Sequence, residues 1–462
     1  MMLLSHIAAA VKGSLIGSDV VLRNVAINTR EDCQGRLFVA LKGDNFDAHD
    51  YVENAKESGA AALLVERNVD SELPVVKVAS THKALMDLAA WWRSQFVLPL
   101  IGVTGSVGKT TVKEMLACIF AELGNGVVTH GNLNNEIGAP LTLMRIKADD
   151  LYAIIEMGMN HAGEIGRISV MSKPTIALIN NAAEAHLEGL GSVEGVARAK
   201  GEIFEGLVEG GTAVINADDE FAHIWVELAG KHKILSFGLT ADADVCGRYT
   251  EKNGRLAVKI TTAKESFKLK VKSVGEHSAR NVLAATAVAL AANVPAALIK
   301  QGLAKFSPIN GRMSIEKGAG ITVIDDTYNA NPASMRAAIN VLVKNEDNTL
   351  IVGDMAELGA AALAEHKALG EQAAKRGVKT LLACGQYASL VVDAYANQAS
   401  NYDAMAFRDQ SELLSYLQNN TLTGTVLVKG SRSAKMERVV EALLKKTNDS
   451  GQSKGSATKG EC

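Results

Sequence analysis

Short, uninterrupted apolar runs alternate with longer amphipathic stretches along most of the chain. Residues 100–103, 151–156 and 175–180 are apolar runs of this kind, each followed by a segment with helical spacing. Strands covered by helices on both faces read as continuous apolar runs, because neither face meets water. The alternation therefore predicts α/β domains built on mostly parallel, doubly wound sheets.

The runs fall into three blocks, and a chain of 462 residues is long enough for two or three domains. The first block, residues 1–98, is expected to hold strands at 37–41 and 61–65 and a helix at 48–58 that ends before Gly59. In the second block, residues 99–310, a helix is expected to run to Leu123 after the first strand. Further strands are predicted there at 212–216 and 233–237, and a helix at 280–292.

The third block, residues 311–446, repeats the same alternation. Its predicted strands are 321–325, 349–353, 380–385 and 425–429. The segment that follows, residues 447–462, is rich in Lys, Ser, Gly and Thr and lacks apolar periodicity, so a disordered tail is predicted.

One segment breaks the rhythm of the second block. Residues 244–274 alternate polar and apolar side chains around Lys252-Asn253-Gly254. Alternation with period two indicates strands with one exposed face, and Asn-Gly favours a tight hairpin turn. We predict an antiparallel extension of the second domain.

Composition narrows the class of protein. The formal net charge is −3, which argues against nucleic acid or an anionic membrane as the main partner. The five cysteines have no CxxC or His/Cys spacing, so neither a disulfide framework nor a zinc ribbon is indicated. Neither a signal peptide nor a membrane-spanning apolar run is recognised, and we expect a cytoplasmic protein.

The strongest chemical motif lies between a predicted strand and a predicted helix. Glycines at such a turn let backbone N–H groups face phosphate oxygens, and the helix N-terminus adds partial positive charge. In this motif Lys109 can span two phosphates and Thr110 can offer its hydroxyl to Mg²⁺. The residues expected to contact ATP are Thr104, Gly105, Ser106, Val107, Gly108, Lys109, Thr110 and Thr111.

The loop departs from the commonest phosphate-loop pattern, which has a glycine five places before the Gly-Lys pair. Val103 stands there, and the glycines fall instead at 102, 105 and 108. An ordinary glycine-rich turn is the alternative interpretation.

Three further polar residues follow strand-like or helical runs. Glu156 ends a predicted strand beside the loop, where a carboxylate is well placed for Mg²⁺. A glutamate bonded within a neighbouring loop is the alternative. Taken singly, His186 has the setting of a structural histidine and Lys200 that of a solvated helical lysine. These residues indicate a Mg-nucleotide enzyme and nothing more specific.

Several strings together resemble the Mur ligase family of peptidoglycan synthesis, and the resemblance covers nearly the whole chain. They are residues 102–115, 131–135 with 138–142, 156–158, 185–189 and 216–219. Other strings resemble the branch that joins D-alanyl-D-alanine to UDP-N-acetylmuramoyl-tripeptide. These are residues 37–43 with 46–50, 325–332, 353–359 and 429–432. The Asp-Asn-Pro-Arg string of the diaminopimelate-adding branch is absent, and the folylpolyglutamate synthetase relatives lack the first domain.

The resemblance implies a three-domain enzyme, and we expect it to be a monomer. Residues 1–98 would hold the UDP end of the muramoyl tripeptide, residues 99–310 would hold Mg-ATP, and residues 311–446 would form a Rossmann-like domain that brings in the dipeptide. The third domain would close over the other two, with a hinge near Pro308 to Gly311.

The resemblance also implies roles for individual residues. Lys109, Thr110 and Glu156 would handle phosphate and a first Mg²⁺. His186 would bind a second Mg²⁺, and Lys200 would react with CO₂ to give a carbamate that supports this metal or the phosphate. Nucleotide contacts would come from Asn281, Arg312, Asp326, Tyr328 and Asn329. Substrate contacts would come from Asn28, Thr29, Arg30, Phe46, Asp47, His49, Asn134 and Asn135, and the dipeptide pocket from Lys429, Ser431 and Arg432. Family members commonly have Asp where this chain has Asn28.

Two other functions remain open at this point. One is a Mur-type amide ligase with a different amino-acid substrate, which would share the catalytic centre. The other is a phosphate-loop switch protein, although the guanine-reading Asn-Lys-x-Asp string is absent.

Overall fold

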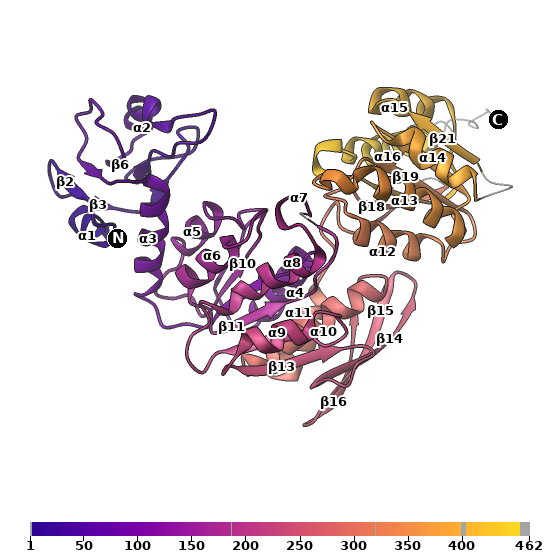
Figure 1. Ribbon diagram of the computed structural model, residues 1–462, viewed down its shortest axis with the longest axis horizontal. Helices are drawn as coiled ribbons and strands as arrows, with labels where there is room; N and C mark the ends of the chain where they lie inside the picture. The colour runs from indigo at the N-terminus through magenta and orange to yellow at the C-terminus, as the bar shows by residue number, and fades with distance from the viewer. Residues whose placement is uncertain (1, 186, 319, 399–402, 453–462) are drawn as a thin grey trace, which may run out of the picture.

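The computed structural model describes residues 2–185, 187–318, 320–398 and 403–452. Three α/β units follow one another along the chain, and the first and third both project from the same side of the central unit (Figure 1). The three-domain fold predicted from the sequence is confirmed.

The first unit is built on a five-stranded sheet in the order β2-β7-β6-β5-β4, in which only β2 is antiparallel to its neighbour. The predicted strands at 37–41 and 61–65 are present in shorter form. The predicted helix at 48–58 is divided into a 3₁₀ turn and an α-helix. The elements are β1 (Met2–Leu3), α1 (Leu4–Ala10), β2 (Ser14–Ile16), β3 (Val21–Leu22), β4 (Val25–Ala26), β5 (Leu37–Val39), η1 (Ala48–Tyr51), α2 (Val52–Glu57), β6 (Ala62–Val65), β7 (Val75–Lys77) and α3 (Thr81–Arg93).

Helix α3 joins the first unit to the central one. Trp92 donates from its ring nitrogen to the carbonyl of Ile146 (3.1 Å), and Arg93 donates from Nε to the carbonyl of Ser172 (3.1 Å). A single cluster of buried apolar side chains continues from one unit into the other. The two units therefore share one hydrophobic core across this helix.

The central sheet has nine strands in the order β16-β15-β14-β13-β12-β11-β8-β10-β9, and it is parallel from β14 to β9. The five apolar runs predicted as strands are all strands. The elements are β8 (Leu100–Thr104), α4 (Lys109–Phe120), β9 (Val127–Val128), α5 (Gly138–Leu143), β10 (Ala153–Glu156), α6 (Glu164–Ser172), β11 (Ile176–Ile179), α7 (Leu187–Leu190), α8 (Val193–Gly201), η2 (Glu202–Phe204), β12 (Thr212–Asn216), α9 (Ala222–Ala229), β13 (Lys233–Gly238), β14 (Val245–Lys252), β15 (Arg255–Thr262), β16 (Ser266–Val271), α10 (Glu276–Ala291) and α11 (Ala296–Lys305).

The predicted antiparallel extension is confirmed as β14, β15 and β16. The turn between β14 and β15 has positive φ at both Asn253 (50°) and Gly254 (70°). A two-residue hairpin turn of this twist needs left-handed backbone at both central positions, which Asn and Gly adopt most readily.

The third unit has a six-stranded sheet in the order β17-β18-β22-β19-β20-β21, in which only β17 is antiparallel. Its four predicted strands are present. The elements are β17 (Ser314–Lys317), β18 (Ile321–Asp326), α12 (Pro332–Leu342), β19 (Asn348–Gly353), η3 (Gly359–Ala361), α13 (Ala362–Arg376), β20 (Thr380–Cys384), α14 (Ala388–Ala396), β21 (Asp403–Phe407), α15 (Gln410–Asn419), β22 (Gly424–Lys429), η4 (Arg432–Ala434) and α16 (Glu437–Gln452).

The expected start of the disordered tail at residue 447 needs correction, since α16 continues to Gln452. Val439, Val440 and Leu443 are buried and anchor the first turns of this helix. Once a helix is nucleated by packing, each further residue adds a backbone hydrogen bond at little cost. The rest of the predicted tail lies outside the described residues.

Candidate active site

The predicted phosphate loop lies at the centre of the molecule. Buried strand β8 leads into it, and Gly108 (φ 83°) precedes the first turn of α4. A Cβ atom at Gly108 would lie 2.5 Å from Oδ1 of Asn281. Glycine is required here both by the left-handed backbone and by the close approach of α10.

Asparagines from the neighbouring strand hold the loop in place. Val107 donates its N–H to Oδ1 of Asn181 (2.9 Å), and Asn180 donates from Nδ2 to the carbonyl of Val107 (2.9 Å) and to Oδ1 of Asn281 (2.9 Å). The sequence analysis missed Asn180 and Asn181. Their signal is two amides directly after an apolar strand run.

Lys109 lies inside the loop and donates from Nζ to the carbonyl of Gly105 (2.5 Å). Burial lowers the pKa of Lys109, and the carboxylate of Glu156 partly offsets this shift. Cation and carboxylate therefore face the same small volume at the start of α4.

Glu156 ends β10 and is 2% exposed. Its Oε1 accepts from Nδ2 of Asn134 (2.8 Å), whereas its buried Oε2 has no hydrogen-bond partner within the described chain. A buried carboxylate oxygen left without a donor fits a bound cation. Thr110, also buried, comes from the adjacent helix turn.

No cluster of three or more His, Cys, Asp or Glu side chains suited to a metal occurs within the described residues. Mg²⁺ usually takes one or two protein carboxylates and completes its shell with waters and substrate phosphates. Glu156 and Thr110 beside a phosphate loop fit that pattern.

Lys200 lies on α8 and is 2% exposed, so the solvated setting that its short string indicates when taken singly is wrong. Burial, and then the nearby charge of Lys109, lowers the pKa of Lys200 well below its usual value. Burial and the neighbouring cation both disfavour the charged form of this amine. His186, the other residue expected here, lies outside the described residues.

The third unit contributes residues from the carboxyl ends of β18 and β22. Lys429 is 2% exposed, forms an ion pair with Asp326 and donates to the carbonyl of Asn329 (2.9 Å). The guanidinium of Arg312 lies 3.9 Å from the ring centroid of Tyr328, a cation–π contact. Lys429 thus fixes the loop after β18.

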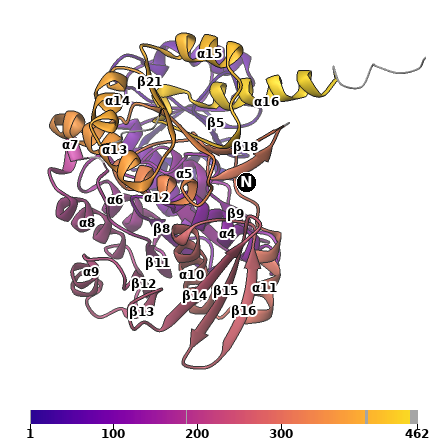
Figure 2. The same cartoon turned by 90° about the vertical axis from the view of Figure 1, so that its right-hand side faces the viewer.

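A cavity of about 410 Å³ lies between the central and third units and brings most of the predicted residues together. Helix α12 of the third unit, drawn above α10 of the central unit in Figure 2, and α10 itself both contribute lining residues. The predicted residues that line it are Ser106, Val107, Gly108, Lys109, Thr110, Thr111, Asn134, Asn135, Glu156, Asn281, Arg312, Asp326, Tyr328, Asn329, Lys429 and Arg432. Lining residues that the sequence analysis missed include Asn132, Asn160, His277 and Glu357. Thr104, Gly105, Lys200 and Ser431 do not line the cavity, nor do any residues of the first unit.

The candidate residues of the first unit form a separate group. Asn28 accepts from the N–H of Arg30 (3.0 Å) and so shapes the turn that carries Thr29. His49 is buried, and its ring nitrogens contact Asp47 (2.6 Å) and the N–H of Glu66 (3.0 Å). Phe46, by contrast, is 55% exposed and stacks on Tyr51. The ring of His49 is engaged within its own domain, and Phe46 offers the exposed surface.

Three family models match consecutive parts of the chain. They are described as Mur ligase family, catalytic domain (residues 21–92), Mur ligase middle domain (residues 103–289) and Mur ligase, glutamate ligase domain (residues 311–432). Together they cover each of the three α/β units.

Curated relatives and solved structures match over almost the full length. The chain is 42% identical to the UDP-N-acetylmuramoyl-tripeptide–D-alanyl-D-alanine ligase of Escherichia coli K12, over 95% of this chain and 98% of that one. It is 38% identical to the enzyme of the same name from Haemophilus influenzae, over 96% and 98%. The crystal structure of MurF from Acinetobacter baumannii superposes with a TM-score of 0.89 at 34% identity, covering 96% of this chain and 98% of that one. MurF of Thermotoga maritima in complex with ADP gives a TM-score of 0.80 at 27% identity, covering 93% and 98%. The chain therefore belongs to the Mur ligase family.

Proposed function

We infer that the chain is an ATP-dependent ligase that joins D-alanyl-D-alanine to UDP-N-acetylmuramoyl-tripeptide, giving the UDP-muramoyl-pentapeptide of peptidoglycan synthesis. One observation carries this inference: the phosphate loop, Glu156 and the third-unit residues around Tyr328 line one cavity. The relatives that match the whole chain at 42% and 38% identity bear the name of this reaction. We place the enzyme in the cytoplasm as a monomer.

The reaction begins with transfer of the γ-phosphoryl group of ATP to the terminal carboxylate of the tripeptide. The amine of the dipeptide then attacks the acyl carbon, phosphate leaves, and an amide forms. We assign to Lys109 and the amides of the loop the stabilisation of negative charge that spreads over the phosphoryl oxygens; their place at the start of α4 and in the wall of the cavity supports this role. Charge stabilisation and alignment are the main contributions that a protein can make to such a transfer.

Magnesium, when bound, would neutralise phosphate charge and let an anionic carboxylate approach a triphosphate. Glu156 and Thr110 are the residues we assign to a first ion. A second ion, with His186 and a carbamylated Lys200 as its supports, is part of the proposal.

The carbamate of Lys200 is proposed from burial as well as from family resemblance. A neutral lysine amine adds CO₂ and releases one proton, so the neutral amine becomes an anionic carbamate. Lys200 is 2% exposed, and the charge of Lys109 acts on it. An anion at this position would attract the cation of Lys109.

Of the three residues predicted for the dipeptide pocket, one is suited to the carboxylate of the dipeptide. Lys429 is already paired with Asp326, and Ser431 is 1% exposed. Arg432 lines the cavity with a 64% exposed side chain, although it also lies near Glu437 (3.3 Å). Because a guanidinium can bind a carboxylate through two hydrogen bonds, we assign Arg432 to the dipeptide. The first unit, with Asn28, Thr29, Arg30 and Phe46, is assigned to the UDP end of the other substrate.

The test is phosphate release from Mg-ATP by the purified chain, with the muramoyl tripeptide and D-alanyl-D-alanine added singly and together. Release that needs both substrates, with formation of the pentapeptide, is the expected result. Release supported by another amino acid in place of the dipeptide would identify a different amide ligase. Hydrolysis indifferent to both substrates would favour a nucleotide switch.

A further inference from the structure

Strands β14, β15 and β16 form an antiparallel ribbon with two unlike faces. One face carries Leu256, Val258 and Ile260, which are buried with residues of α10 and α11. The other face is exposed. Its charged residues are Arg248, Lys252, Arg255, Lys259, Lys268 and Lys270 on the strands, with exposed Lys272 one residue beyond the end of β16.

This basic sheet face contains seven cations and no Asp or Glu among its outward-facing strand residues. None of the seven has an ion-pair partner among the residues that the structure describes. The only acidic residue of β14, Glu251, turns to the other side, where it pairs with Lys344 of the third unit (2.7 Å). The cations therefore reinforce one another's potential at this surface.

The strand register places like charges directly opposite each other. Lys259 lies directly opposite Arg248 on β14 and directly opposite Lys268 on β16, so three cations form a row across the three strands. Like charges in such positions destabilise a sheet. This row of like charges destabilises the folded sheet. An anionic partner that neutralises the repulsion would explain why the row is present.

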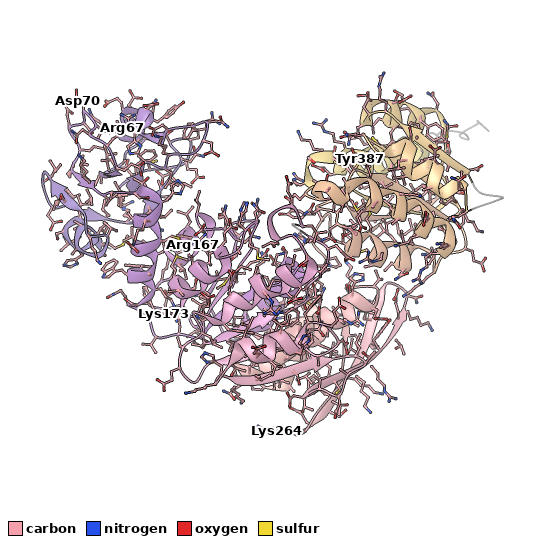
Figure 3. All side chains as sticks on the ribbon, in the orientation of Figure 1. Arg67, Asp70, Arg167, Lys173, Lys264 and Tyr387 are labelled. Carbon is pink, nitrogen blue, oxygen red and sulfur yellow. The ribbon has the colours of Figure 1, made fainter. Side chains whose placement is uncertain are left out.

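Charge is also distributed unevenly along the molecule, with a basic end and a more acidic remainder. The whole chain sums to −3, so the residues outside this face are on balance more acidic than that total. Lys264, in the turn between β15 and β16, lies at the end of the molecule opposite the first and third units (Figure 3). An anionic surface would attract this end and repel the rest.

We propose that the basic sheet face docks the enzyme onto an anionic phospholipid bilayer. The face is a pleated surface of lysines and arginines that alternate with Thr250, Ala257 and Thr261. No aromatic side chain stands among its outward positions to stack on nucleic-acid bases, and no large apolar one to enter lipid. Clusters of this kind adsorb to anionic headgroups through charge alone, within about one Debye length.

Co-sedimentation of the full-length chain with lipid vesicles tests the proposal. Binding is expected to vesicles rich in phosphatidylglycerol, to be absent with phosphatidylcholine alone, and to fall steeply as salt is raised. The variant Lys259→Glu/Lys268→Glu/Lys270→Glu should lose at least about tenfold in partitioning. The control Lys147→Glu/Lys231→Glu/Lys367→Glu changes the net charge equally at exposed lysines elsewhere and should bind nearly as the wild type does.

Substrate-dependent phosphate release should be unchanged in both triple variants, which shows that they are folded. Equal loss in the two variants would overturn the proposal, since it would show a response to net charge alone. Failure of the wild type to bind anionic vesicles at low salt would overturn it as well. Tighter binding to duplex or single-stranded DNA than to vesicles at the same salt would assign the face to nucleic acid instead.

The single variant Lys259→Glu gives an independent readout. It replaces two like-charge contacts by opposite-charge pairs with Arg248 and Lys268, so the midpoint of chemical denaturation should rise. Vesicle binding should fall in the same variant. A rise in stability with vesicle binding unchanged would show that the face does not contact the bilayer.

Discussion

At the scale of single residues, the two carboxylate oxygens of Glu156 differ in their hydrogen bonding. One accepts from Asn134, and the other is buried without a donor from the described chain. Leaving a buried polar atom unsatisfied costs about 1–3 kcal/mol, and more when it is charged. Such a residue is better explained by a cation that it binds than by its contribution to folding.

Glu156→Gln should therefore reduce phosphate release by about 100-fold or more while leaving the free energy of unfolding unchanged or higher. The amide oxygen can still accept from Asn134, but the charge that attracts a metal is lost. Steady-state kinetics with a magnesium titration, together with urea denaturation, measures both effects. Activity within a few-fold of the wild type would remove Glu156 from the metal site.

A second prediction at the scale of single residues concerns the carbamate of Lys200. The wild type incubated with ¹³C-bicarbonate should show a carbamate carbon resonance that is missing from Lys200→Arg and Lys200→Gln, because neither side chain can add CO₂. Both variants should lose activity, and denaturation midpoints show whether they remain folded. Full activity after rigorous removal of CO₂, with no resonance in the wild type, would contradict the carbamate.

At the scale of elements, Asp218 fastens the end of β12 to the loop between β13 and β14. Its carboxylate accepts from the N–H groups of Leu239 (2.7 Å), Thr240 (3.0 Å) and Ala241 (2.8 Å). Burial would raise the pKa of Asp218, but these hydrogen bonds outweigh it and lower the pKa to about 2. The ionised form is the one that holds the loop.

Because the pKa is lower in the folded than in the unfolded chain, this stabilisation is present above pH 4 and is lost as the pH falls toward 2. Asp218→Asn should lower the free energy of unfolding by about 2 kcal/mol at pH 7. Urea denaturation of both proteins at several pH values should show the difference shrinking below pH 4. A constant difference at all pH values would show that charge is not the cause. The variant also complements Glu156→Gln, since it should lose stability and keep its activity.

The elements that could be predicted from the sequence are those whose signals are local. Buried strands such as β8 and β12 read as apolar runs, and the phosphate loop is recognisable from the spacing of its glycines and Lys109. Edge strand β21 was not predicted, since its residues are largely exposed and carry no such run. The short strands of the first unit were missed for a similar reason, because two or three residues show no period.

The site residues divide in the same way, into those with a local sequence signal and those brought to the site only by folding. Glu156 could be predicted because it ends a strand beside the loop. Asn180 carries a similar signal, an amide directly after a strand run, that was overlooked, whereas His277 could not be predicted, because only folding brings this residue of α10 to the wall of the cavity. The burial of Lys200 was also hidden, because a helix that is covered by packing and one that faces water can carry the same short string.

At the scale of the whole molecule, the contacts between the first and central units differ from those between the central and third units. The first and central units share an apolar core through α3, with Trp92 and Arg93 bonded across the joint. The described contacts between the central and third units include ion pairs of Arg336 with Glu184 (2.6 Å) and of Lys344 with Glu251 (2.7 Å). Partly exposed ion pairs contribute about 0–1 kcal/mol each, so they can be broken and remade.

The segment between the central and third units is suited to bending. Phe306 is buried in the central core, while Gly311 (φ 77°) donates to the carboxylate of Asp325 (2.8 Å) and accepts from the N–H of Tyr328 (3.0 Å). Gly311 is thus fixed to the third unit, and rotation is confined to the residues just before it. This moves the predicted hinge by one residue, from Pro308–Gly311 to Ser307 through Asn310.

We therefore predict that the third unit moves against a fixed pair formed by the first and central units. Exclusion of water from an acyl phosphate gives closure a chemical purpose. Spin labels on exposed positions should report a shorter distance between the first and third units when a non-hydrolysable ATP analogue and the muramoyl tripeptide are added. The distance between the first and central units should stay constant, which serves as the internal control. If both distances change, the shared core at α3 is not rigid; if neither changes while ligands bind, the hinge is wrong and the cavity must act in its present form.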